Sequence, residues 1–314
     1  SRLEAGAANV VSVMGLVFFP IMAAVIIELI FRENLRAREK QKEMLEEIRL
    51  SNKKLEVYAD RLKDESLRLQ AEVNIARQIQ TMVLPSDEEI QAISELDIAC
   101  IMRTADEVGG DYYDVIKIDD TVTIGIGDVT GHGLSSGIIM LMAQTVIRTL
   151  AELRITDPMR FLGLVNKVLY ANIRRIREDR NMTLALVTYR NGECVASGQH
   201  ESIILQRADG RAEVIDTLNM GFYIGLMEDV EEQLGKAEFR LGPGDFMLLY
   251  SDGITEAMDR DGRQFGLERL CDAAKKYSCF PAKKIVAKVI KDVYNHMGEK
   301  EIGDDISLVV VKQR

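Results

Sequence analysis

The stretch GDVTGHG, residues 127–133, separates two segments of different periodicity. Before it, residues 121–126 alternate threonine or glycine with valine or isoleucine, which is the period-two pattern of a half-buried strand. After it, residues 135–153 have the apolar spacing of a helix. Asp128 therefore stands at the end of a predicted strand, in a turn whose glycines let the backbone and an ion approach each other closely.

Short apolar runs bounded by turn residues predict further strands along the chain. They lie at residues 96–102, 183–190, 193–198, 202–207, 245–251 and 306–312. Helices are predicted at 158–176, 265–277 and 282–297, the first with Asp157 as its N-cap and Pro158 in its first turn. Because the strands come in bunches separated by helix pairs, the pattern predicts antiparallel sheets covered by helices. This is an α+β domain, expected over residues 85–314.

No charged residue occurs between Ala5 and Ile27. A run of this length can cross a bilayer as a helix, which needs about 20 residues, and it is too long for the apolar part of a signal peptide. A buried core helix is the alternative, and the length disfavours it. The sequence predicts a single transmembrane helix over residues 1–31. By the positive-inside tendency the remainder is cytoplasmic, because basic residues follow at Arg32, Arg36, Arg38 and Lys40.

Residues 32–84 have the pattern of one long helix with a seven-residue apolar repeat. Leucine at d positions and a single Asn52 at an a position favour a parallel two-stranded coiled coil in fixed register, so we expect a homodimer. The seam weakens after Leu69, which suggests a switch next to the following domain. A helix packed on that domain is the alternative. The a positions are Leu45, Asn52, Ala59, Ser66, Val73 and Gln80, and the d positions are Ile48, Leu55, Leu62, Leu69, Ala76 and Val83.

The composition disfavours several classes of function. The chain has a net charge of −10 and no uninterrupted basic block, so no nucleic-acid partner is expected, because phosphate backbones need a cationic surface. Its four cysteines form no Cys-x-x-Cys pair, and none has an arginine six positions later. We therefore expect reduced thiols and no thiolate phosphatase. Its three histidines lie far apart in the sequence, which disfavours a histidine zinc site.

Four aspartates stand beside glycines at the ends of predicted strands or turns: Asp111, Asp128, Asp252 and Asp304. In antiparallel sheets one strand's end lies beside the next strand's start, so all four can meet at one edge. Their like charges would then repel unless divalent cations neutralise them, and oxygen-only ligands suit Mg²⁺ or Mn²⁺. The alternative is that each aspartate only initiates a turn. For four together we favour the metal site.

The segment 72–314 resembles the SpoIIE/RsbU-type branch of the PPM (PP2C-like) serine/threonine phosphatases. The resemblance rests on stretches in the family's order: EVNIARQIQ (72–80) leading to Leu84-Pro85, EVGGDYYD (107–114), GDVTGHG (127–133), YSDGITEA (250–257) and GDDISLVVV (303–311). It implies a bacterial protein with a two-sheet β-sandwich flanked by helices and two Mn²⁺ or Mg²⁺ ions at one end. One departure concerns substrate recognition, because the family's Gly-His-Pro-Pro-like turn is replaced by SGQHES at 197–202.

The resemblance also implies roles for individual residues. Asp111 and Asp128 would be the catalytic residues through the metal ions: Asp128 bridges both ions with the Val129 carbonyl beside it, and Asp111 binds one of them. Asp252 and Asp304 correspond to ligands of the other ion. In such a site the ions generate a hydroxide that attacks phosphorus.

Two neighbouring residues leave alternatives open. Asp305 is adjacent to Asp304 and is the alternative ligand. His132 lies close enough to the predicted metal site in sequence to donate a proton or orient a ligand, and it is equally compatible with a structural role in its turn.

The sequence as a whole predicts a membrane-anchored, metal-dependent serine/threonine protein phosphatase that is regulated through its coiled-coil linker. By resemblance, its substrate would be a phosphoprotein of the STAS type that antagonises an anti-sigma factor. The alternative is a non-catalytic signalling module that binds a partner from the same anchored coiled coil. Four retained aspartates count against that alternative, because a binding module has no need to gather mutually repelling charges.

Overall fold

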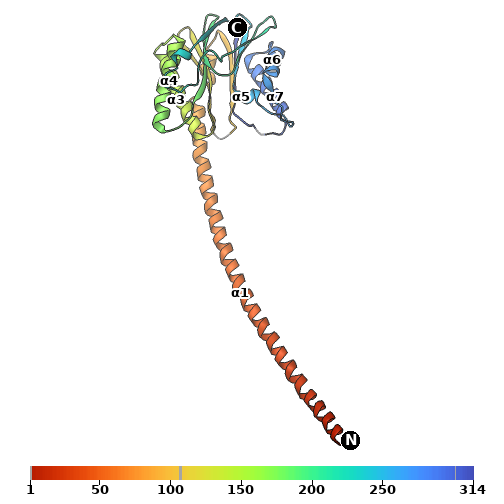
Figure 1. The fold of residues 1–314 in the computed structure, drawn as a ribbon. Coiled ribbons are helices and arrows are strands. Elements are labelled where there is room, and N and C mark those ends of the chain that lie inside the picture. The colour runs from red at the N-terminus through yellow and green to blue at the C-terminus, as the bar shows by residue number, and fades with distance from the viewer. Residues whose placement is uncertain (1, 106–107, 301) are drawn as a thin grey trace. The chain divides into compact units, whose positions relative to one another are not determined.

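The computed structural model describes residues 2–105, 108–300 and 302–314, with side chains from residue 18 onward within these ranges. By its internal contacts the chain divides into two compact units, Ser1–Gln70 and Ala71–Arg314. One uninterrupted helix, α1 (Arg2–Met82), runs through the first unit and into the second (Figure 1). The last three turns of α1 therefore belong to the C-terminal unit.

The helix α1 ends just before Leu84-Pro85, because a residue that precedes proline avoids the α conformation. The short helix α2 (Asp87–Gln91) follows, and Ser86 is its N-cap. The Ser86 hydroxyl accepts a hydrogen bond from the Glu89 amide at 3.2 Å, and the Glu89 carboxylate accepts one from the Ser86 amide at 2.8 Å. This reciprocal capping box fixes the path of the chain between α1 and the first strand.

Among the described residues, ten strands form two antiparallel sheets. Sheet A has the order β1-β10-β9-β6-β7, and sheet B has the order β2-β3-β4-β5-β8. The strands of sheet A are β1 (Leu96–Arg103), β6 (Ile203–Gln206), β7 (Ala212–Ile215), β9 (Phe246–Tyr250) and β10 (Ile306–Gln313). The strands of sheet B are β2 (Asp111–Ile118), β3 (Thr121–Val129), β4 (Met182–Arg190), β5 (Glu193–Gln199) and β8 (Lys236–Arg240).

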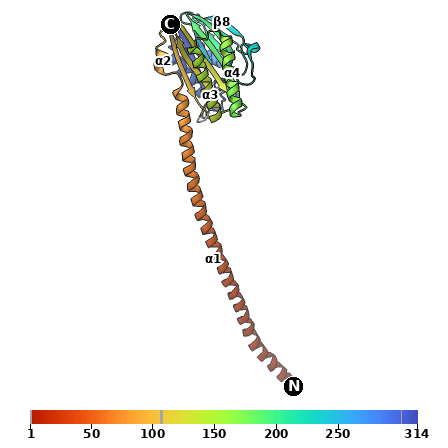
Figure 2. The ribbon, with the colours of Figure 1, turned by 90° about the vertical axis from the view of Figure 1, so that its left-hand side faces the viewer.

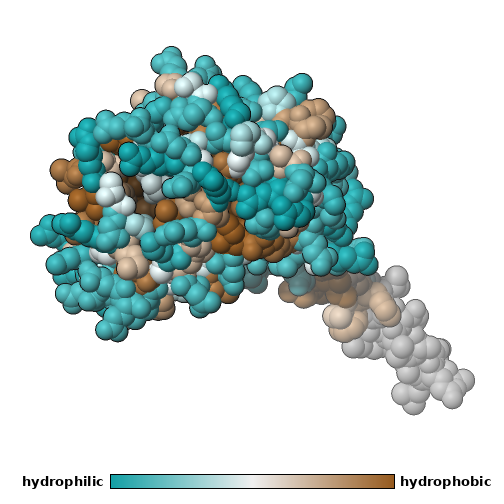
Figure 3. Space-filling model, turned by 90° about the horizontal axis from the view of Figure 1, so that it is seen from above, coloured by the Kyte–Doolittle hydropathy of each residue, from teal (hydrophilic) through white to brown (hydrophobic). Residues whose placement is uncertain are grey.

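Helices cover the outer face of each sheet, so the domain has four layers (Figures 1 and 2). The helices α3 (Leu134–Glu152) and α4 (Pro158–Ile176) share a buried core with sheet B, and α6 (Gly266–Tyr277) and α7 (Ala282–Met297) share one with sheet A. A third apolar core fills the space between the sheets. The surface seen from above is mainly hydrophilic, with apolar residues in its hollows (Figure 3). The predicted α+β arrangement of two sheets flanked by helices is confirmed.

Three strands were not predicted from the sequence: β2, β7 and β8. Strand β2 is buried on both faces and still contains two aspartates, so its sequence DYYDVIKI has neither clean alternation nor a continuous apolar run. Strands β7 and β8 lie at the edges of their sheets, and β7 is mostly exposed, which leaves them little apolar signal. The predicted N-cap of α4 is confirmed, since the Asp157 carboxylate accepts a hydrogen bond from the Met159 amide at 3.1 Å.

Among the helices with described side chains, α3 has the length and apolar composition of a membrane span. Half of its apolar window is buried inside the protein, where it contacts α4, β2 and β3. It is therefore a core helix of the sandwich. The membrane span predicted over residues 1–31 falls largely on side chains outside the described residues, so membrane anchoring remains a prediction.

Candidate metal centre

The hairpin of β2 and β3 brings two of the predicted site residues face to face. Asp111 is the first residue of β2, and its partner in the antiparallel register is Asp128, near the end of β3. Side chains directly opposite each other on neighbouring strands have Cβ atoms about 5 Å apart. Asp111 is 1% exposed. A buried carboxylate and its charged neighbour therefore share one edge of sheet B.

Gly110 gives this pair its close backbone environment. A Cβ atom at Gly110 would lie 2.6 Å from the Val129 carbonyl oxygen and 2.9 Å from Asp128 Oδ1. The Val129 amide donates a hydrogen bond to the Gly110 carbonyl at 3.2 Å. The Val129 carbonyl and the Asp128 carboxylate thus lie on the same side of the hairpin, in a space that any larger residue at Gly110 would fill.

Sheet A contributes Asp252, at the start of the short helix α5 (Asp252–Thr255) that follows β9. The adjacent Ser251 hydroxyl donates a hydrogen bond to the Asp305 carbonyl at 3.0 Å. Gly253 approaches the backbone of residues 304–305 so closely that a Cβ atom there would collide with the Asp305 carbonyl. The segment that carries Asp252 is therefore in direct contact with the segment that carries Asp304.

The two neighbouring aspartates 304 and 305 have different environments. Asp305 is buried, and its carboxylate accepts hydrogen bonds from the amides of Ala105 and Gly110, each at 2.8 Å. Asp304 is exposed and accepts a hydrogen bond from the Asp305 amide at 2.8 Å. Asp305 therefore ties sheet A to the turn that precedes Asp111, whereas Asp304 faces solvent at the same edge.

Mutual repulsion is visible in the acidities of this group. Burial, followed by the charges of Asp252, Asp304 and Asp305, raises the pKa of Asp128 to about 7. Burial and the charge of Asp128 raise the pKa of Asp111 well above its ordinary value. The pKa of Asp252 is also raised, by burial and then by Asp304. The carboxylates therefore belong to one electrostatic group.

The donor set fits a hard divalent cation. Asp111 Oδ2 is buried and has no hydrogen-bond partner among the described residues, and a positive ion is the kind of neighbour that would satisfy it. Within the described part of the chain, the side chains are not already gathered around a common point, since no three acidic, cysteine or histidine groups are close enough to enclose an ion. The fit therefore rests on the chemistry and shared edge of the carboxylates.

Two histidines have different relations to this edge. His132 is exposed in the loop between β3 and α3. His200 was not predicted as a site residue, although it lies in the divergent stretch 197–202. Its Nδ1 atom is 2.8 Å from the Thr183 hydroxyl, which donates a hydrogen bond to the Asp128 carbonyl at 3.4 Å. Burial lowers the pKa of His200 to about 4, so a neutral imidazole supports the strand beside Asp128.

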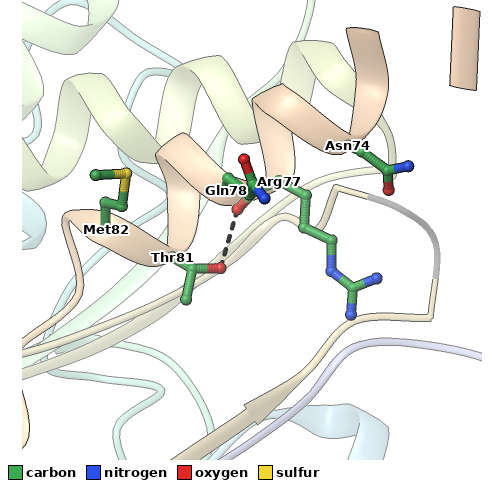
Figure 4. Close-up of a pocket in the computed structure, with 5 residues that line it drawn as sticks. All are labelled: Asn74, Arg77, Gln78, Thr81 and Met82. Carbon is green, nitrogen blue, oxygen red and sulfur yellow. Dashed lines mark hydrogen bonds between the residues drawn. The ribbon is translucent and has the colours of Figure 1, made fainter. Parts of the chain in front are cut away.

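The end of α1 reaches the same edge through Gln80, which is 2% exposed. Its side-chain amide donates a hydrogen bond to the Gly109 carbonyl at 2.9 Å, and its carbonyl accepts one from the Gly109 amide at 3.3 Å. The exposed side of the same turns lines an open pocket with Asn74, Arg77, Gln78, Thr81 and Met82 (Figure 4). The sequence marked Gln80 as a heptad position and as the end of the family-like stretch 72–80, and neither observation predicted its contact with the turn before Asp111.

Comparison with known proteins identifies the family. Residues 118–314, more than half of the chain, match the family model of stage II sporulation protein E (SpoIIE). The chain belongs to the SpoIIE family. It is 26% identical over 254 residues to the phosphoserine phosphatase RsbU of Bacillus subtilis, covering 78% of this chain and 71% of RsbU.

Solved structures agree with this assignment. The PP2C domain of SiaA from Pseudomonas aeruginosa has a TM-score of 0.69 and 22% identity, over 79% of this chain and 98% of that one. The RsbU and RsbW domains of Rv1364c from Mycobacterium tuberculosis have a TM-score of 0.60 and 21% identity, over 70% of this chain and 60% of that one. The chain is therefore a phosphoprotein phosphatase of the SpoIIE/RsbU type with a PP2C fold.

The acidity of Asp128 predicts how the stability of this SpoIIE-family domain depends on pH. A carboxyl group whose pKa rises from about 3.9 in the unfolded chain to about 7 in the folded one stabilises the fold below pH 4. That stabilisation is lost as the pH rises through 7. With EDTA present, we expect D128N to gain more thermal stability relative to the wild type at pH 8 than at pH 5.

The lowered pKa of His200 has the opposite effect, because it favours the fold at higher pH. His200 is present in both D128N and the wild type, so its contribution cancels when their Tm values are subtracted. Thermal unfolding monitored by circular dichroism at both pH values measures the difference. A D128N-minus-wild-type shift in Tm that is equal at pH 5 and pH 8 would show that the pKa of Asp128 is not raised in the folded domain.

Proposed function

We propose that the domain hydrolyses phosphoserine and phosphothreonine in proteins at a centre of two Mn²⁺ or Mg²⁺ ions. The proposed ligands are Asp111, Asp128, the Val129 carbonyl, Asp252 and Asp304. The observation that carries the proposal is the antiparallel register that sets Asp111 opposite Asp128. The contact between the segments of Asp252 and Asp304 at the other sheet completes it.

Each protein group has a distinct part in this proposal. Asp111 and Asp128 supply buried negative charge at the edge of sheet B, and Asp252 and Asp304 supply it from sheet A. Asp305 is assigned a positioning role instead of a ligand role, because backbone amides already occupy its carboxylate oxygens. When bound, divalent cations in such a site acidify water and neutralise charge on the phosphoryl group.

Metal removal tests the proposed activity on the whole chain in detergent. We expect turnover of phosphoserine and phosphothreonine peptides to disappear in excess EDTA and to return when Mn²⁺ or Mg²⁺ is added, whereas phosphotyrosine peptides are poor substrates. Phosphate release measures each rate. Equal turnover with and without EDTA would overturn the metal-dependent mechanism.

We also propose that this phosphatase works as a membrane-anchored dimer. The uncharged run from Ala5 to Ile27 supports the anchor, and the d-position leucines of α1 support the dimer, because Leu55, Leu62 and Leu69 are each more than half exposed. Such a stripe needs an apolar partner. Oxidative crosslinking of N52C in isolated membranes tests the dimer, and a chain that stays monomeric would refute it. Extraction with alkaline carbonate tests the anchor, and a chain that leaves the membrane would refute it.

The proposed dimer offers a route for regulation. The a and d positions of the last heptads, Val73, Ala76, Gln80 and Val83, are the residues of these turns that are partly or fully buried within the C-terminal unit. A change in the packing of α1 upstream would therefore reach the turn before Asp111 through Gln80. The similarity to the phosphoserine phosphatase RsbU supports a phosphoprotein substrate. The STAS type is what the family resemblance implies, and a panel of phosphorylated STAS proteins would test it by comparing their kcat/KM values.

A further inference from the structure

We propose that the end of α4 and the loop after it form a docking surface for an acidic segment of the phosphoprotein substrate, which deepens the proposed function and rests on it. Residues 174–180 contain four arginines and two acidic residues, in a chain whose net charge is −10. The sequence showed no basic block, because isoleucine and the two acids interrupt the arginines. We call residues 174–180 the arginine turn.

The arginine turn borders the proposed metal centre. The Arg180 guanidinium donates a hydrogen bond to the Thr130 carbonyl at 2.6 Å, and the Thr130 amide donates one to the Asn181 carbonyl at 2.9 Å. Thr130 directly follows Asp128 and Val129 in the chain. A substrate whose phosphate reaches Asp128 would therefore have its neighbouring residues close to the arginine turn.

Three of the arginines are available to a partner. Arg174, Arg175 and Arg177 are exposed, and Arg174 lies over the ring of Tyr170 at 5.3 Å. No carboxylate of the described residues forms an ion pair with any of the three. Arg180 differs, because it holds the Thr130 carbonyl and lies 3.6 Å from the Glu178 carboxylate. Its role is to fix the turn against the loop at residue 130.

The backbone conformation of Arg177 bears on a simpler explanation of the arginines, which is that they only complement the dipole of α4. Basic residues at a helix C-terminus also complement the helix dipole, which would account for Arg174 and Arg175. Arg177, however, has a left-handed conformation with φ of 60° at the end of α4. Glycine is the usual residue at such a position, because a side chain there is strained. Arg154 has the same conformation after α3, but it forms an ion pair with Asp119 at 2.9 Å, whereas Arg177 forms none with the described residues.

An apolar platform lies beside the arginine turn, since a Cβ atom at Gly225 would lie 4.0 Å from the Arg180 carbonyl oxygen. Tyr223, Leu226 and Met227 are 36%, 46% and 41% exposed. Their loop is fixed by buried Asn166 of α4, which donates hydrogen bonds to the carbonyls of residues 227 and 228 at 3.0 Å and accepts one from the amide of residue 225 at 2.8 Å. Arginine with tyrosine and methionine is the composition of protein-binding surfaces. The combination therefore favours an acidic protein segment over free phosphate.

Peptide binding tests the proposal independently of turnover. The probes are fluorescent peptides that carry a non-hydrolysable phosphonate analogue of phosphoserine, flanked by either acidic or neutral residues. By fluorescence anisotropy we expect the wild-type chain in Mn²⁺ to bind the acidic peptide about tenfold more tightly, with an affinity that falls as salt rises. We expect R175E/R177E to abolish this preference. The control R190E/R211E reverses the charge of two exposed arginines at the β4–β5 and β6–β7 hairpins, and we expect it to keep the preference.

The variant R177G distinguishes loss of docking from loss of folding. Glycine relieves the strained conformation, so we expect R177G to have an unchanged or higher Tm and a smaller preference for the acidic peptide. An undiminished preference in R175E/R177E would overturn the proposal. It would also be overturned if phosphatidylserine vesicles, instead of the peptide, bound in a manner dependent on Arg175 and Arg177. Failure of the proposed function would show separately, as an absence of metal-dependent turnover while peptide preference persists.

Discussion

The substitution D128N is expected to lower kcat/KM for a phosphoserine protein by about 10³-fold, the upper range for removing one preorganised charge-stabilising group. Asparagine keeps the shape of the side chain and removes its charge, so the edge shared with Asp111 loses a ligand that the proposed cations require. The same change removes a carboxyl group whose pKa is raised by burial and by the neighbouring aspartates. Activity and the stability of the metal-free domain should therefore move in opposite directions.

The matched control for D128N is D120N, which makes the same change in the turn at the other end of the β2–β3 hairpin. Asp120 is exposed and lies outside the proposed site. Phosphate release from a phosphoserine peptide gives the rates, and thermal unfolding in EDTA gives the stabilities. A D128N protein that retained more than a tenth of wild-type activity would refute the assignment of Asp128 as a ligand.

The substitution Q80L is expected to reduce phosphatase activity about tenfold and to lower the free energy of unfolding by roughly 2 kcal/mol. Leucine removes both partners of Gly109, whose buried amide and carbonyl would be left without hydrogen bonds. The turn that leads into Asp111 would then be less firmly held. We expect the Mn²⁺ concentration for half-maximal activity to rise, since the change acts on the geometry of a proposed ligand.

Gln78 provides the control for this prediction, because Q78L makes the same chemical change two residues earlier on the exposed side of α1 (Figure 4). Urea denaturation and Mn²⁺ titrations of activity compare the two variants. If Q80L and Q78L behave alike, the end of α1 does not support the metal centre, and the proposed route of regulation through this helix fails.

The sequence predicted the parts of this fold that have a local signal. The alternation in residues 121–126 marked β3, and the bunching of strands between helix pairs predicted antiparallel sheets covered by helices, whereas the two-sheet sandwich was implied by the family resemblance. Strand β2 could not be recognised, because Asp111 and Asp114 interrupt its apolar residues. In the folded domain Asp114 is buried and forms an ion pair with Arg148 at 3.2 Å. That partner is 34 positions away, and a single sequence gives no distance between them.

The same limit applies to the candidate site. The sequence could place the four aspartates in one site, because that inference needed only the rule that neighbouring antiparallel strands begin and end at the same edge of a sheet. The proposal of Asp304 over Asp305 as a ligand depends on hydrogen bonds from Asp305 to amides about 200 positions away, and these exist only once both sheets have formed. Likewise, the heptad pattern placed Gln80 in a seam, whereas its contact with Gly109 depends on how the end of α1 packs.

The position of β10 in sheet A has a consequence for protein synthesis. This strand is the last element of the domain, yet it lies between β1 and β9, and residues 304–305 immediately precede it. A nascent chain from which residues 304–313 have not yet emerged therefore lacks both a central strand and the hydrogen bonds that join Asp305 to the turn before Asp111. The proposed site is complete only once this segment has been made and folded, so we expect a chain truncated before residue 304 to have no phosphatase activity.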